Sequence, residues 1–366
     1  MSGTSRPSPE DGARRRTLRR LAVVGAIAIA ASGVAACGSS DDDDDASTGA
    51  ATAAATSEGA ATEASTSIEG KRIAVVSLTD ANPWAAVFNR TVKANLEAEG
   101  AEVTVTGATD PAGQPQLINQ AAAEKPDLII LEALDSKAVA PAIAKARAQG
   151  IPVLNADGKA DPSVADDINQ VLSDNVALGE FAAQNIIEGL KKQGKESGKI
   201  GVITGTEAML LTQERMEGFN RVLAENPGYE IVFQEDGNWD PVKSGQIATQ
   251  MFAKLGKDGI DAAYGMADYM AVPIVTAAKQ AGIPVGLEND GLIITGGNCF
   301  KVGIEAIDAG EMYGTATEDP GTLANEVSAY ATKMLAGEDV PKTVTVEEAR
   351  VTKDTIEQYR EQCTQA

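Results

Sequence analysis

The sequence contains no histidine, and this absence excludes several kinds of chemistry. Without an imidazole, the chain cannot build a Ser-His-Asp or Cys-His nucleophile system, a histidine-ligated metal site or an imidazole acid–base catalyst. Its three cysteines are also too few for a four-cysteine zinc site. Enzymes that use carboxylates alone stay possible, so the composition favours a binding protein without settling the matter. We expect no metal and no cofactor.

Positive charge is also scarce. The 31 Lys and Arg residues stand against 53 Asp and Glu, which gives a formal net charge of −22 over 366 residues. A chain of this charge repels a phosphate backbone, and no basic patch compensates, so we exclude nucleic acid as a partner. No G-x-G-x-x-G motif follows a predicted strand, which argues against dinucleotide binding.

The first 36 residues have the layout of a secretory signal peptide. Five arginines between positions 14 and 20 precede sixteen apolar or small residues, 21–36, a stretch just under the ~17 residues of a membrane span. The small residues Ala35 and Ala36 before Cys37 resemble a bacterial lipobox. We therefore expect cleavage after Ala36 and a lipid on Cys37. An uncleaved membrane anchor is the alternative, and the export route stays open between the general and the twin-arginine pathway.

Residues 37–70 are predicted to form a disordered tether. Five aspartates, 41–45, are followed by a stretch rich in Ala, Ser, Thr and Gly without hydrophobic periodicity. Such a segment buries too little apolar surface to order itself. We interpret the aspartates as a solvated spacer, with a calcium site as the alternative. Signal, lipidated cysteine and tether predict an extracytoplasmic protein, lipid-anchored to the outer face of the cell membrane.

From residue 72 onward, strand and helix patterns alternate. Residues 73–78 form a continuous apolar run of strand length, and residues 83–99 follow with apolar side chains at helical spacing. Later strands are expected at 103–106, 128–131 and 152–154, and a second series at 199–204, 230–234, 262–264 and 292–295. Alternation of this kind indicates right-handed βαβ units. The sequence therefore predicts an α/β fold of two doubly wound lobes with parallel sheets.

Polar residues stand directly after several of these strands, where open parallel sheets bind their ligands. They are Asn82, Glu132, Asp157, Asp268 and Asn298. Residues of these types also serve as turn and cap residues, and Asn82-Pro83 in particular is a good helix start. Each is therefore a candidate for ligand binding with an ordinary structural alternative.

Seven short motifs follow one another along the body of the chain. They are Asn82-Pro83-Trp84, the strand 151–154 running to Asp157, Ser173-Asp174-Asn175, 214–219 with Arg215, Trp239-Asp240, 268–271, and 303–307 with 314–320. In this order, from the strand at Ile73 to the strand near Val351, they resemble the ribose-binding type of periplasmic sugar-binding protein of ABC importers. The resemblance implies a type I periplasmic binding protein fold, with a site formed by Asn82, Trp84, Glu132, Asp157, Arg215, Trp239, Asp268, Asn298 and Glu318.

The resemblance also implies how the protein works. Two lobes, residues 71–173 plus 319–343 and residues 174–318 plus 344–366, would be joined by a three-crossing hinge and close on a ligand. The protein would be a monomer that captures a sugar or polyol, without enzymatic activity, and delivers it to an ABC importer permease. A ligand sensor for a membrane receptor is an alternative, and a carboxylate-based glycosidase is another. Trp84 and Trp239 would each offer an aromatic face, although both also suit a core.

Departures from the family pattern affect the ligand. Glu132 replaces an asparagine, Glu318 a glutamine, Ala267 a ligand-binding asparagine, and Gly158 stands in the place of a second arginine. The predicted pocket is therefore more acidic than the ribose pattern, with Arg215 as its cation. An acyclic polyol, a sugar bound through another face and an amine-bearing ligand are each compatible, so the identity of the ligand stays open.

The cysteines predict one disulfide. With Cys37 lipidated, Cys299 and Cys363 are the remaining pair, in a compartment outside the reducing cytosol. Both are expected in the second lobe. Two unpaired thiols are the alternative.

Overall fold

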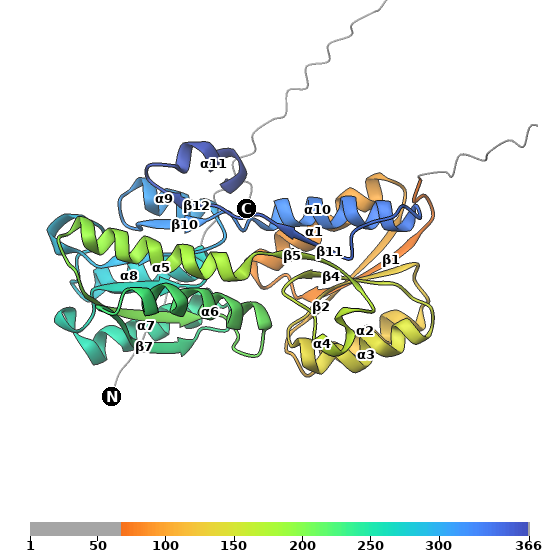
Figure 1. Cartoon of the computed structure of the whole chain (residues 1–366), viewed down its shortest axis with the longest axis horizontal. Helices are drawn as coiled ribbons and strands as arrows, with labels where there is room; N and C mark the ends of the chain where they lie inside the picture. The colour runs from red at the N-terminus through yellow and green to blue at the C-terminus, as the bar shows by residue number, and fades with distance from the viewer. Residues whose placement is uncertain (1–66, 365–366) are drawn as a thin grey trace, which may run out of the picture. The chain divides into compact units, whose positions relative to one another are not determined.

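The structure, a computed structural model, describes residues 67–364. The signal peptide, Cys37 and nearly all of the predicted tether lie outside these residues. The described part contains two six-stranded sheets, each at the centre of its own lobe (Figure 1). The predicted fold of two doubly wound α/β lobes is confirmed.

The first lobe is built on a sheet with the strand order β11-β5-β4-β3-β1-β2, in which all pairs are parallel. Its strands are β1 (Arg72–Leu78), β2 (Glu102–Ala108), β3 (Leu128–Glu132), β4 (Val153–Asp157), β5 (Asn169–Ser173) and β11 (Thr343–Val346). Its helices are α1 (Pro83–Ala98), α2 (Gln114–Ala123), α3 (Ser136–Ala148), α4 (Pro162–Ala165) and α10 (Pro320–Leu335). Strands β3 and β4 are buried along their whole length, as expected when helices cover both faces of a parallel sheet.

The second lobe repeats this plan with the order β12-β10-β9-β8-β6-β7, and β12 runs antiparallel to β10. Its strands are β6 (Gly198–Thr204), β7 (Tyr229–Asp236), β8 (Ala262–Gly265), β9 (Ile293–Thr295), β10 (Gly314–Ala316) and β12 (Arg350–Thr352). Its helices are α5 (Asn175–Lys192), α6 (Leu210–Glu225), α7 (Pro241–Leu255), α8 (Asp268–Gln280), α9 (Lys301–Asp308) and α11 (Ile356–Cys363).

The chain passes between the lobes three times. The first crossing joins β5 to α5 at Asp174, and the second joins β10 to α10 at residues 317–319. We expected the third at 343–345, but β11 pairs in parallel with β5 from Thr343 to Val346, so it falls at 347–349. The sequence Thr343-Val344-Thr345-Val346 is short and half polar, which suits an edge strand but also an extended linker.

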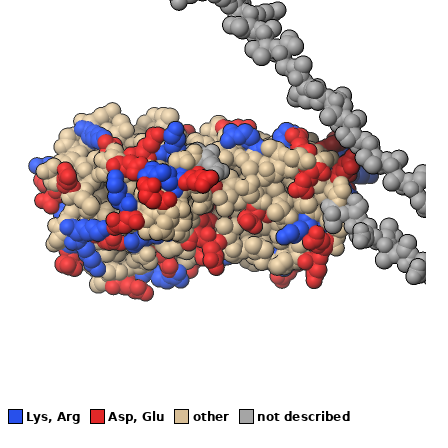
Figure 2. Space-filling view, turned by 90° about the horizontal axis from the view of Figure 1, so that it is seen from above, with Lys and Arg blue, Asp and Glu red and all other residues tan. Residues whose placement is uncertain are grey.

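The surface carries charges of both signs. On the face shown in Figure 2, acidic and basic side chains are interspersed, without a continuous basic patch in the coloured part. Within residues 67–364, none of the helices has the length and apolar character needed to cross a membrane.

Candidate ligand-binding site

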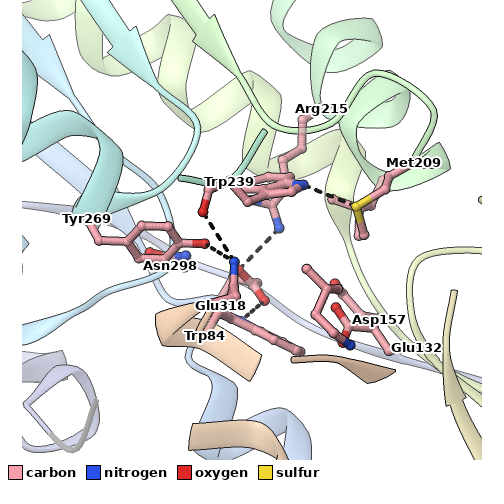
Figure 3. Close-up of a pocket in the computed structure, with 12 residues that line it drawn as sticks. Trp84, Glu132, Asp157, Met209, Arg215, Trp239, Tyr269, Asn298 and Glu318 are labelled. Atoms are coloured by element: carbon pink, nitrogen blue, oxygen red, sulfur yellow. Dashed lines mark hydrogen bonds and ion pairs between the residues drawn. The ribbon is translucent and has the colours of Figure 1, made fainter. Parts of the chain in front are cut away.

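A cavity lies between the two lobes, at the carboxyl ends of their strands (Figure 3). The first lobe supplies side chains from the ends of β1, β3 and β4 and the start of α1, and the second from α6, α8 and the loops after β7 and β9. The lining residues are Leu78, Asn82, Trp84, Glu132, Asp157, Met209, Leu211, Arg215, Trp239, Tyr269, Asn298 and Glu318. The structure thus brings together all of the predicted site residues except Asp268.

The lobes touch directly at this cavity. Asn82 caps α1, since its side-chain oxygen accepts a hydrogen bond from the Ala85 amide. The amide nitrogen of the same side chain donates across the cleft to the Trp239 carbonyl, at 3.3 Å, and to the Tyr269 hydroxyl, at 3.4 Å. Near the rim, Lys159 of the first lobe pairs with Glu214 of the second at 2.6 Å. The structure is therefore a closed arrangement of the lobes.

One tryptophan from each lobe faces the cavity. The Trp84 indole nitrogen donates to Glu318 at 2.7 Å, and the Trp84 ring stacks on Phe88. The Trp239 ring lies beneath the Arg215 guanidinium. It also lies against Gly205, where an added Cβ would come within 1.9 Å of the indole. Both tryptophans are buried, so both planes have fixed orientations. Fixed aromatic planes suit the apolar C–H faces of a sugar or polyol.

Arg215 is the largest fully buried side chain described. Its guanidinium donates to the Asn175 side-chain oxygen at 2.9 Å, the Met266 carbonyl at 3.2 Å and the Glu318 carboxylate at 3.1 Å. Its helix, α6, packs very closely on α5. A Cβ added at Gly179 of α5 would lie only 1.8 Å from the Arg215 carbonyl oxygen. A glycine at this contact therefore lets the two helices approach and sets the position of the guanidinium.

Three carboxylates in the lining are buried: Glu132, Asp157 and Glu318. Burial raises the pKa of Glu132 to about 7, and repulsion from Asp157 adds to this rise. Burial also raises the pKa of Asp157, and it raises that of Glu318 well above the usual range, although Arg215 opposes both shifts. The site therefore holds more acid groups than its single guanidinium can balance.

Three lining residues have a left-handed backbone. The φ angles are 68° at Asp157, 54° at Trp239 and 76° at Asn298. Asn and Asp tolerate this region better than most residues, whereas a tryptophan there is uncommon. Such conformations cost about 1–3 kcal/mol each and persist where the surrounding fold imposes them, often at ligand sites. Here they turn side chains at loop ends toward the cavity.

Asp268, a predicted site residue, is not among the residues that line the cavity. Its carboxylate accepts hydrogen bonds from the Phe300 amide, at 2.7 Å, and the Thr315 hydroxyl, at 2.6 Å. Its own amide donates to the Asn298 side chain at 3.1 Å. Asp268 therefore connects the start of α8 to β10 and to the loop that carries Asn298. Through this contact it helps to position Asn298, which lines the cavity.

The sequence analysis missed four lining residues: Leu78, Met209, Leu211 and Tyr269. Leu78 is the last residue of a predicted strand, and Tyr269 directly follows the predicted site residue Asp268. Met209 and Leu211 lie at the start of α6 and are apolar, and an apolar residue at a helix start carries no signal that separates a ligand contact from core packing.

Arrangements of three or more acidic or cysteine side chains suited to a metal ion are absent from the part of the chain that the structure describes.

Comparison with known proteins agrees with this geometry. The periplasmic binding protein domain matches residues 73–339. A ribose import binding protein of Haemophilus influenzae is 25% identical over 291 residues, covering 79% of this chain and 94% of the relative. A xylitol-binding protein of Mycolicibacterium smegmatis is 25% identical over 242 residues, covering 66% of this chain and 64% of the relative.

Solved structures show the same fold. A periplasmic solute-binding protein of Actinobacillus succinogenes with bound D-allose has a TM-score of 0.69 at 24% identity. It covers 79% of this chain and is itself covered completely. Because the family match spans well over half of the sequence, the chain belongs to the periplasmic binding protein domain family.

Proposed function

We propose that this protein binds a sugar or polyol between its lobes and delivers it to an ABC importer, without chemically altering it. The observation that carries the proposal is the cavity itself, where a fixed tryptophan from each lobe flanks a set of buried polar groups. The relatives support it, since their names or titles refer to ribose import, xylitol binding and bound D-allose. All three are named as binding proteins.

Different lining residues bind different parts of the ligand. The two indole rings bury the C–H faces of the ligand, while hydroxyl groups donate to Asp157 and to the side-chain oxygen of Asn298. Arg215 and Glu318 form an ion pair, which fixes the position of both side chains on one side of the pocket. Rotation about the three crossings opens and closes the cleft. The contacts of Asn82 and Lys159 with the opposite lobe form only when the lobes meet.

The place of action follows from the N-terminal segment. We infer that the signal peptide directs export and that a lipid on Cys37 holds the mature protein at the outer face of the membrane. The tether then leaves a monomeric body free to meet the permease. Mass spectrometry of the membrane-extracted protein should show an N-terminal diacylated or triacylated Cys37, and a Cys37→Ser variant should be released or stay unprocessed.

A thermal-shift screen tests the proposed function. A ligand that binds only the folded state stabilises it by RT ln(1 + [L]/Kd), so a true ligand should raise the unfolding midpoint by several degrees. The panel contains pentoses, hexoses, polyols, their amino derivatives and a set of glycosides. Small-angle scattering of the best hit should show compaction if the lobes close. The proposal is wrong if no compound of the panel raises the midpoint, or if the glycosides are hydrolysed.

Removal of either tryptophan should weaken binding while the fold is kept. Trp84→Ala and Trp239→Ala each delete one aromatic face of the cavity, and we expect a loss of about 1–3 kcal/mol in binding free energy by calorimetry. Tyr359→Ala removes an aromatic side chain from α11, away from the cavity lining, and serves as the control. Normal binding by both tryptophan variants, together with lower thermal stability, would show that these rings serve only as core.

A further inference from the structure

The cavity has a charge imbalance that the protein does not resolve. Glu132, Asp157 and Glu318 line it, and Arg215 is the one basic residue in the described lining. Arg215 forms its ion pair with Glu318. The nearby Lys159 is held at the rim by Glu214. Glu132 and Asp157 thus have no ion-pair partner within residues 67–364.

Two carboxylates of the cavity lining have oxygen atoms that receive no hydrogen bond from the described residues. Asp157 is 4% exposed, and its Oδ1 atom has no hydrogen-bond partner among the described residues. The Oε2 atom of Glu132 accepts from the Ser77 hydroxyl at 2.6 Å and from the Leu78 amide at 3.3 Å, whereas Oε1 receives no donor from the described chain. Glu132 lies close enough to Asp157 for the charge of Asp157 to raise the pKa of Glu132, and Figure 3 shows both in the same part of the cavity. Buried polar atoms without partners are rare and call for an explanation.

The position next to Asp157 does not supply a cation. It is Gly158, and a Cβ added there would lie 3.2 Å from the Leu211 side chain of the other lobe, which is tighter than most Cβ contacts. A ligand that carries both hydrogen-bond donors and a positive charge would therefore complement this pair of carboxylates.

We propose that the ligand is an amino sugar or amino polyol whose ammonium group binds between Glu132 and Asp157. An ammonium group has three donors and a full positive charge, so it satisfies both free oxygens and offsets their repulsion. A hydroxyl group donates one hydrogen bond and brings no charge to offset the repulsion between the two carboxylates when both are ionised. This inference rests on the proposed function and names the class of ligand for the same site.

Matched ligand pairs test the inference on the native protein. Each neutral sugar or polyol of the thermal-shift panel is compared with its amino-deoxy counterpart and with the N-acetyl form, for example D-sorbitol with 1-amino-1-deoxy-D-sorbitol, and D-glucose with D-glucosamine and N-acetyl-D-glucosamine. We expect the best amino compound to bind at least tenfold more tightly than its neutral partner near pH 7.5, and acetylation to abolish this advantage. If a neutral compound binds as tightly as its amine or more tightly, the inference is wrong and the proposed function stands. If neither class binds, both are wrong.

Charge-removing variants locate the ammonium group. Asp157→Asn and Glu132→Gln keep the shape of the side chains, and each should reduce the preference for the amine over its neutral partner to about onefold to threefold. Asp167→Asn removes the same charge from an exposed position of the first lobe and should leave the preference unchanged. A preference that survives in both cavity variants would overturn the assignment.

The pH dependence of the native protein gives a readout that does not require any variant to fold. The pKa of Glu132 is about 7, so this carboxyl loses its proton as the pH rises through neutrality. Affinity for an amine that stays protonated should therefore increase between about pH 5 and pH 8, whereas affinity for the neutral polyol should not. The charged and titratable groups that line the cavity with Glu132 are Asp157, Arg215, Glu318 and Tyr269. Glu348, at the third crossing, also has a pKa raised to about 7, mainly by burial and in part by the charge of Asp157. A flat or falling amine affinity would contradict the inference.

Discussion

Replacement of Arg215 by alanine should lower the free energy of unfolding by about 3–5 kcal/mol and abolish ligand binding. The guanidinium is buried with three hydrogen-bonded partners, and it is the only cation that lines the cavity in the described chain. Without it, Glu318 stays in a buried position without its ion-pair partner. Urea denaturation of the ligand-free variant measures the first effect and calorimetry the second.

Two further variants show whether charge or volume causes the loss. Arg221→Ala removes an arginine from the same helix, where it forms an exposed ion pair with Glu180, and should cost less than about 1 kcal/mol. Arg215→Met combined with Glu318→Gln removes both buried charges and keeps most of the volume, so it should recover much of the stability but not the binding. If Arg215→Ala costs no more than Arg221→Ala, Arg215 does not hold the site together. If the double variant is no more stable than Arg215→Ala, the cost comes from packing.

The fold could be predicted because its strongest signals are local. Buried parallel strands such as β3 are continuous apolar runs, and the helices between them have apolar side chains at helical spacing. The signal fails for short, Thr-rich strands. β10 is three residues long and β11 alternates Thr with Val at the sheet edge, so neither contains enough apolar residues to stand out. The position of the third crossing was therefore wrong by a few residues.

The site could be predicted as far as topology determines it. Parallel strands end at one edge of the sheet, and this places Glu132 and Asp157 together although 25 positions separate them in the sequence. Topology does not determine which side chain at the start of a helix faces the cavity. At the start of α8 the Tyr269 side chain faces the cavity and Asp268 turns toward Thr315, a difference of one residue that spacing does not resolve. The contact of Trp84 with Glu318 joins segments 234 positions apart and depends on the course of the second crossing.

Loss of the bond between Cys299 and Cys363 should lower the free energy of unfolding by about 4 kcal/mol in the chain-entropy model. The structure places the two residues as a disulfide with their Cα atoms 4.7 Å apart, and the bond closes a loop across 64 positions. It fastens α11 to the loop after β9. Denaturation of the Cys299→Ser, Cys363→Ser double variant, compared with the native protein with and without reductant, measures the effect.

The bond should also matter for the ligand, because Cys299 follows Asn298 in the cavity lining. Both residues have positive φ angles, 76° and 56°, and a conformation of this kind persists only where the surroundings impose it. Freed from α11, the loop should relax, so we expect the double variant to bind ligand several-fold more weakly even where it is fully folded. Thiol labelling of unfolded, unreduced protein in a Cys37→Ser background provides the control. Two free thiols would refute the disulfide, and unchanged affinity in the double variant would show that the hydrogen bond from Asp268 to Asn298 is enough to hold the loop.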